Sequence, residues 1–115
     1  MLKITKMNNE LRGLDKFEAK KIILDFYADW CGPCKQLSKT LDLMAQEGID
    51  CLSDVEVVKV NVDEFGDLVN KFEVRSMPTL VFLSRSAAGS YIKVHQKVGT
   101  FTKERFIKTL TCAYE

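Results

Sequence analysis

Residues 28–35 read Ala28-Asp29-Trp30-Cys31-Gly32-Pro33-Cys34-Lys35, and two residues separate the two thiols. An almost continuously apolar run at residues 22–28 leads into them, which is typical of a central strand covered on both faces. From Cys34 to Gly48 the apolar residues recur at helical spacing, so we expect a helix that starts at the cysteines. Two cysteines at this spacing can close a disulfide at the head of a helix, where free N–H groups and the helix dipole favour a thiolate. The stretch therefore predicts a strand-to-helix junction that carries redox chemistry.

On either side of this junction, strand and helix patterns alternate. Before it, residues 2–5 predict a short strand, and residues 8–19 predict a helix because Leu11, Leu14 and Phe17 recur at roughly helical spacing. After it, the patterns predict a helix at residues 65–72, a hairpin loop at 84–90, a last helix capped by Thr102, and strands at 55–62, 79–83 and 92–98. The order β-α-β-α-β-α-β-β-α predicts an α/β fold with a mixed central sheet, helices on both faces and a final antiparallel hairpin.

Length and charge narrow the classes of function. The 115 residues, 46% of them hydrophobic, predict a single domain over residues 1–115, which we expect to be a monomer. The formal net charge is +1, from 17 basic and 16 acidic residues, so we expect neither a nucleic acid nor a membrane as a partner. Residues 1–6 lack the apolar core of a signal peptide, and no apolar run approaches the roughly 18 residues of a membrane span. We therefore expect a cytoplasmic protein with reduced thiols and one reversible pair.

Zinc binding is the chemical alternative for paired cysteines, and a zinc site needs four ligands. The rest of the chain offers only Cys51, Cys112 and His95, with no second paired spacing, so we expect no metal. Cys51 is then predicted to be a semi-buried thiol without a role, and His95 an exposed strand residue. Cys112 falls opposite the apolar face of the last helix, which predicts exposure and suggests the hypothesis of oxidation between molecules.

The motifs together resemble the thioredoxin family over essentially the whole chain. The resemblance rests on Trp30-Cys31-Gly32-Pro33-Cys34-Lys35, Asp25, Met77-Pro78-Thr79 and Val98-Gly99. It implies the thioredoxin fold and a dithiol–disulfide oxidoreductase that reduces protein disulfides, with a role in electron transport and redox homeostasis. It also implies no cofactor beyond a redox-active Cys31–Cys34 disulfide, and a separate thioredoxin reductase that recharges it.

The two cysteines have different expected roles. Cys31 is expected to be the attacking thiol, because N–H groups at the strand-to-helix junction can stabilise its thiolate. Cys34, one turn into the helix, is expected to resolve the mixed disulfide. Pro33 suits the first turn of a helix, and Gly32 lets the backbone of a partner approach closely. In the family this pair also tunes the redox poise, and Gly-Pro resembles the reducing members.

Asp25 is unusual because it lies within an apolar strand. An ionised carboxylate there is costly, so its pKa should be raised, and buried carboxyls of this kind are often functional. The resemblance implies that Asp25 assists proton transfer at Cys34; the alternative is a satisfied polar group near the sheet edge. Lys59, between Val58 and Val60, matches the family's lysine near that aspartate, and its alternative is an amine that reaches water.

Three further positions are expected to contact a substrate, with Pro78 in a supporting role. The resemblance implies a cis peptide bond at Pro78, which would turn the Met77 backbone toward the cysteines to pair with an extended substrate segment. Gly99 would shape the same groove, or would be a plain turn glycine. Trp30 would be a contact platform for protein substrates or an apolar lid on the strand end.

The sequence therefore favours a protein-disulfide reductase. The alternative from another class is a thioredoxin-fold binding or adaptor module within a larger assembly, in which the redox activity is incidental. The combination of Cys31, Cys34 and Asp25 favours the enzyme, since a pure scaffold does not need this set.

Overall fold

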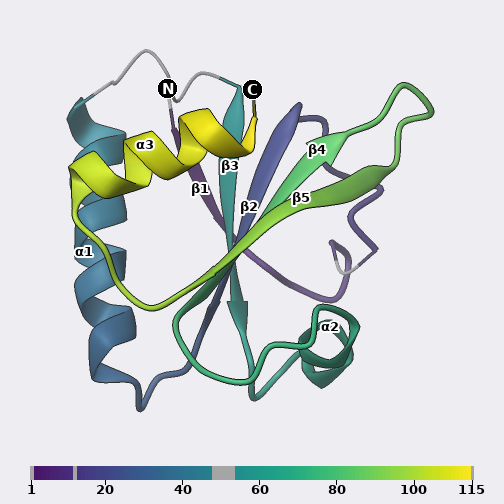
Figure 1. Ribbon diagram of the computed structural model, residues 1–115. Coiled ribbons are helices and arrows are strands. Elements are labelled where there is room, and N and C mark those ends of the chain that lie inside the picture. The colour runs from purple at the N-terminus through teal and green to yellow at the C-terminus, as the bar shows by residue number, and fades with distance from the viewer. Residues whose placement is uncertain (1, 12, 48–53, 115) are drawn as a thin grey trace.

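A five-stranded sheet forms the centre of the computed structural model, which describes residues 2–11, 13–47 and 54–114 (Figure 1). Within these residues the element order is β-β-α-β-α-β-β-α. The strands are β1 (Lys3–Lys6), β2 (Lys21–Tyr27), β3 (Val55–Asn61), β4 (Thr79–Arg85) and β5 (Tyr91–Val98). The helices are α1 (Gly32–Glu47), α2 (Gly66–Lys71) and α3 (Lys103–Ala113). None of these helices is long and apolar enough to cross a membrane.

The strands lie in the order β1-β3-β2-β4-β5, which puts β2 at the centre. Strand β3 pairs in parallel with both β1 and β2, whereas β4 pairs antiparallel with β2 and with β5. The mixed sheet and the final hairpin are therefore confirmed. The apolar run at the centre of β2 is buried because strands flank it on both sides and helices cover both faces of the sheet.

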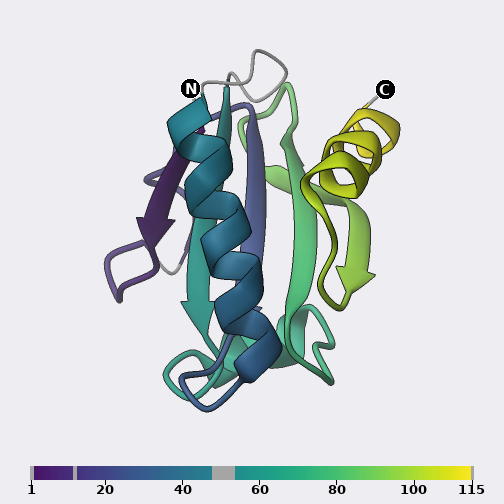
Figure 2. The same cartoon turned by 90° about the vertical axis from the view of Figure 1, so that its left-hand side faces the viewer.

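The helices divide between the two faces, with α1 and α3 on one and α2 on the other (Figures 1 and 2). Successive side chains of a strand point to opposite faces, so β2 contributes to two cores. Ile23 packs with Leu37 of α1 and Phe106 of α3, whereas Ile22, Leu24 and their neighbours pack beneath α2. Asp25 shares the face of Ile23, and the fold thus directs this carboxyl toward the α1 side.

The prediction of a helix at residues 8–19 is wrong. Its described residues form turns, closed by N–H bonds from Leu11 to the carbonyl of Asn8, from Leu14 to that of Leu11 and from Phe17 to that of Leu14. The Asn8 side chain also accepts the N–H groups of Glu10 and Leu11, as an N-cap does, but the turn that it starts does not continue as a helix. Leu14 has a φ of 64°, which an α-helix does not allow. Because successive turns begin three residues apart, Leu11, Leu14 and Phe17 recur at nearly the spacing of a helix face. Leu14 and Phe17 are buried in the core beneath α2, although no helix forms.

The other elements lie where their patterns predict, with ends that differ by one or two residues. Helix α1 begins at Gly32, directly after the first cysteine. Helix α3 begins after Thr102, whose side chain accepts the N–H of Arg105 at 3.3 Å. These confirm the predicted starts of both helices. Cys51 lies outside the described residues.

Candidate active site

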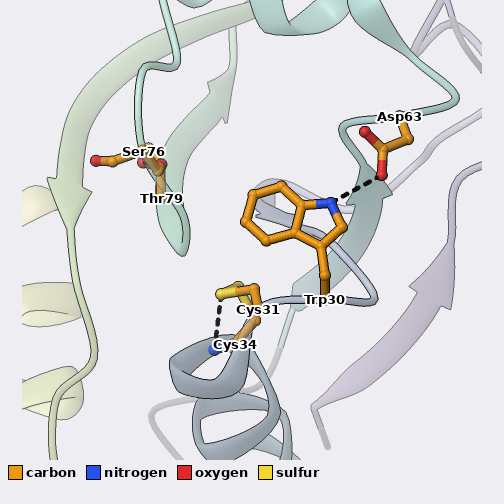
Figure 3. Close-up of a disulfide and its surroundings, with 6 residues drawn as sticks. All are labelled: Trp30, Cys31, Cys34, Asp63, Ser76 and Thr79. Atoms are coloured by element: carbon orange, nitrogen blue, oxygen red, sulfur yellow. Dashed lines mark hydrogen bonds between the residues drawn. A yellow bond between two sulfur atoms is a disulfide. The ribbon is translucent and has the colours of Figure 1, made fainter.

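Cys31 and Cys34 form a disulfide at the head of α1 (Figure 3). The chain leaves β2 at Tyr27, and a turn in which the Cys31 N–H bonds to the Ala28 carbonyl carries it into the helix. The backbone N–H of Cys34 donates to Sγ of Cys31 at 3.2 Å. Because this N–H belongs to the first turn, it has no partner within the helix and can stabilise negative charge on that sulfur. Both cysteines are largely buried, with 6% and 4% of their surfaces exposed.

The residues on the solvent side of the disulfide are exposed and leave room around it. Gly32 and Pro33 are exposed, and a Cβ at Gly32 would meet no atom within 4 Å. Trp30 is 68% exposed, and its indole Nε1–H donates to Oδ2 of Asp63 at 3.2 Å (Figure 3). An indole fixed in this way beside a disulfide fits a contact platform better than a lid, because its ring faces solvent.

The segment before β4 lies across from the disulfide (Figure 3). The Met77–Pro78 peptide bond is cis, as the resemblance implies, and Met77 packs against the cluster of Ala28, Cys31 and Cys34. The Gly99 N–H donates to the Pro78 carbonyl at 2.8 Å, and Gly99 has a φ of 96°, a conformation that favours glycine. Met77, which lies 43 and 46 positions after Cys34 and Cys31, is thus brought to the disulfide by the fold.

Asp25 lies behind the disulfide and is 2% exposed. It pairs with Lys59 of β3 and with Leu80 of β4, so it is not near the sheet edge, and its Oδ1 has no hydrogen-bond partner among the described residues. The alternative of a satisfied polar group near the edge is therefore wrong. Burial raises the pKa of Asp25 from 3.8 to about 6, because desolvation penalises the charged form, and the positive charge of Lys59 offsets part of the rise. The raised pKa expected from the sequence is confirmed.

A cavity of about 310 Å³ joins Asp25 to Cys34. Lys59 lines it and donates its Nζ–H to Oγ of Ser38, so its amine is held by a protein group. Ser38 is a functional candidate that the sequence analysis missed. Its signal is present, since a polar residue four positions after Cys34 lies on the same side of a helix as that cysteine.

His95 and Cys112 lie away from this site. His95 is an exposed residue of β5 whose ring centroid is 5.4 Å from that of Phe82, and Cys112 is an exposed free thiol on α3. The exposure expected for both is confirmed. In residues 2–11, 13–47 and 54–114, no group of three or more His, Cys, Asp or Glu side chains is arranged to hold a metal ion.

Comparisons with known proteins match both the sequence and the fold. The family model described as Thioredoxin matches residues 3–112. Thioredoxin-1 of Drosophila yakuba is 36% identical over 106 residues, which cover 90% of this chain and 96% of the relative. Thioredoxin-1 of Drosophila melanogaster is 40% identical over 86 residues, which cover 75% and 78%. The structure of Trichomonas vaginalis thioredoxin superposes with a TM-score of 0.77 at 28% identity, over 95% of this chain and 96% of that one.

The family match spans nearly all of the chain, and the fold brings the two cysteines of the motif together at the head of α1. Thioredoxins act through a disulfide of their own, without a bound cofactor, and reduce the disulfides of other proteins. The chain therefore belongs to the thioredoxin family and is a dithiol–disulfide oxidoreductase.

Proposed function

We propose that this chain reduces protein disulfides with Cys31 as the nucleophile and Cys34 as the resolving thiol, and that a separate thioredoxin reductase returns it to the dithiol state. In the first step the Cys31 thiolate attacks one sulfur of the substrate disulfide, so a mixed disulfide forms and one substrate thiolate leaves. The N–H of Cys34 donating to Sγ of Cys31 supports this assignment, because it favours the thiolate on Cys31.

In the second step Cys34 loses its proton and attacks Sγ of Cys31. The Cys31–Cys34 disulfide forms, and the second substrate thiolate leaves with the bonding electron pair. Asp25 is the proposed acceptor for the Cys34 proton, since it shares a cavity with Cys34 and has a pKa of about 6, within reach of neutral pH. Lys59 supports this role because its charge acts on that carboxyl.

The exposed surface in front of the disulfide is the proposed docking site for substrates. Trp30 supplies an exposed aromatic face, Gly32 leaves room for an approaching backbone, and the Met77 backbone pairs with an extended substrate segment. Pro78 and Gly99 support this arrangement through the bond between the Gly99 N–H and the Pro78 carbonyl.

We also propose that the chain works as a single-domain monomer in the cytoplasm and carries electrons between its reductase and its substrates. The near-zero net charge supports protein partners over nucleic acids or membranes, because 17 basic and 16 acidic residues give the chain no overall excess of positive charge to attract a phosphate backbone.

The observation that carries the mechanism is the pair of cysteines at the head of α1 with a buried carboxyl behind it. The test is a trapping experiment with Cys34→Ser, which leaves Cys31 free to attack and removes the resolving thiol. We expect the variant, with Cys31 reduced, to attack the disulfides of native insulin and accumulate a covalent mixed disulfide that dithiothreitol releases. Absence of the adduct would contradict the assignment.

Two controls complete this test. Cys112→Ser removes an exposed thiol outside the site and should reduce insulin like the unchanged protein. Cys31→Ser should abolish insulin reduction and form no adduct. An adaptor with incidental redox activity predicts instead that the unchanged protein barely reduces insulin.

A further inference from the structure

Ser38 links α1 to Lys59 of β3 in the cavity behind the disulfide. It lies one turn after Cys34 on the same helix, and both line the cavity of about 310 Å³. Its hydroxyl oxygen accepts a hydrogen bond from the Lys59 ammonium, which reaches across from β3. Lys59 is thereby anchored to a neutral group on the helix side of the cavity.

A charged acceptor is available in the same cavity. Asp25 and Lys59 are register partners on adjacent parallel strands, so their side chains leave the same face of the sheet. Within the described part of the chain, Oδ1 of Asp25 is nevertheless buried without a hydrogen-bond partner, and Lys59 acts on the carboxyl through its charge. Asp25 thus has an unpartnered carboxyl oxygen close to a lysine whose ammonium is bonded to Ser38 instead. This arrangement indicates that the bond to Ser38 prevents Lys59 from pairing with Asp25.

We propose that Ser38 is a positioning residue for proton transfer: its hydroxyl holds the Lys59 ammonium at α1 and so keeps it from pairing with Asp25. This inference rests on the proposed role of Asp25 as proton acceptor. An ammonium in direct contact would stabilise the ionised carboxylate and weaken it as a base. Held at Ser38, Lys59 attracts the carboxylate from a distance and leaves it able to take up the Cys34 proton.

Other charged or titratable groups also surround this carboxyl. They are Lys6 from β1, Tyr27 from β2, Asp29 from the turn after β2, Cys34 and Lys35 from α1, and Lys59 from β3; the partner of Asp25 on β4 is the apolar Leu80. Among these, Lys59 is the group whose charge acts on Asp25. A substitution at Ser38 is therefore expected to act through Lys59.

The test compares Ser38→Ala with Ser38→Thr, which keeps the hydroxyl. Alanine is the best helix former and Ser38 is half-buried, so both variants are expected to fold. The readout is the ¹³C shift of the Asp25 carboxyl in the oxidised protein, titrated from pH 3 to pH 9. We expect Ser38→Ala to move the midpoint down by about one unit, because the released ammonium approaches the carboxylate. Ser38→Thr, which keeps the hydroxyl, should titrate Asp25 with the same midpoint as the unchanged protein. An unchanged or raised midpoint in Ser38→Ala overturns the proposal.

A second background shows whether the effect passes through Lys59. Lys59→Met removes the ammonium and should raise the Asp25 midpoint, and Ser38→Ala added to it should cause no further change. A downward shift that persists without Lys59 would overturn the proposal, since the hydroxyl would then act by another route.

The same variants separate this inference from the proposed function. The rate of disulfide reduction against pH should follow the Asp25 midpoint in each variant and lose that dependence in Asp25→Asn. If Asp25→Asn keeps the original pH profile, the catalytic role of Asp25 fails while the carboxyl titration still tests Ser38. If the Asp25→Asn profile changes but Ser38→Ala titrates like the unchanged protein, the positioning role alone fails.

Discussion

Asp25 occupies a position that disfavours its own charge. Its carboxyl is buried in the central strand, one of its oxygens has no hydrogen-bond partner among the residues that the structure describes, and its pKa is raised to about 6. Such a group weakens the folded state whenever it is ionised, because the unfolded chain solvates the same charge fully. Its presence behind Cys34 does not serve stability, and the proposed role in proton transfer accounts for it.

We predict that Asp25→Asn stabilises the oxidised protein at pH 8 and has a smaller effect at pH 4. Below pH 3.8 the carboxyl is neutral in both folded and unfolded states, whereas above about pH 6 only the folded state bears a desolvated charge. The shift corresponds to about 3 kcal/mol of stability that is present at low pH and lost as the pH rises through 6.

Urea unfolding of both proteins from pH 3.5 to pH 8 measures this difference. The free energy of unfolding of Asp25→Asn minus that of the unchanged protein should grow with pH. The exposed Asp42 of α1 provides the matched control, and Asp42→Asn should show a small difference that stays level. A level difference for Asp25→Asn as well would contradict the assigned pKa.

The elements show where local signals decide structure and where they do not. Thr102 starts α3 as its sequence predicts, because a threonine oxygen at the N-cap satisfies an N–H that the helix leaves free. Residues 8–19 carry the apolar spacing of a helix, and the Asn8 side chain accepts the N–H groups of Glu10 and Leu11 as an N-cap does. They nevertheless form linked turns, and Leu14 has a φ of 64°, which an α-helix does not allow. The backbone beyond the first turn, rather than the capping contact or the apolar period, separates the two cases.

For the last helix, we predict that Thr102→Ala lowers the free energy of unfolding by about 1 kcal/mol, because the Arg105 N–H loses its acceptor. Thermal unfolding monitored by circular dichroism, with urea titrations at 25 °C, provides the measurement. Thr100→Ala changes an exposed threonine of the preceding loop and should be nearly neutral. Equal losses in the two variants would show that the cap contributes nothing.

The molecule as a whole is a sheet between two cores, and its stability depends on both. Phe82 belongs to the core beneath α1 and α3, where its ring lies 6.4 Å from that of Phe106 and 6.2 Å from that of Tyr114. The Tyr114 hydroxyl in turn donates to the carbonyl of Leu83 at 2.8 Å, which ties the end of α3 to β4. Packing of this kind joins the last helix to the central strands.

We therefore predict that Phe82→Ala lowers the free energy of unfolding by about 3–5 kcal/mol, through lost burial and the cavity that remains. Ile92 on β5 is 54% exposed, so Ile92→Ala, which also truncates an apolar side chain, should cost less than about 1 kcal/mol. Urea unfolding at pH 7 measures both. Similar losses would mean that Phe82 is not part of a tightly packed core.

Much of the fold and of the site is predictable from residues close together in the sequence. The β2-to-α1 junction, the strands after it and the cap at Thr102 follow from apolar period and capping chemistry. The redox pair follows from the spacing of Cys31 and Cys34, and the raised pKa of Asp25 follows from a carboxyl within an apolar strand. The cis bond at Pro78 was predictable from family resemblance alone.

Apart from residues 8–19, the strands, the helices and the paired thiols follow from the sequence alone, because backbone preferences and the spacing of two cysteines act over a few residues. Only the tertiary structure decided that β3 lies between β1 and β2, which makes Lys59 the neighbour of Asp25. It also decided that Ser38 holds Lys59 and that Met77 packs against the cysteines. These contacts join residues 21 to 46 positions apart. Packing of the helices on the sheet selects them among the many pairings that the sequence alone allows.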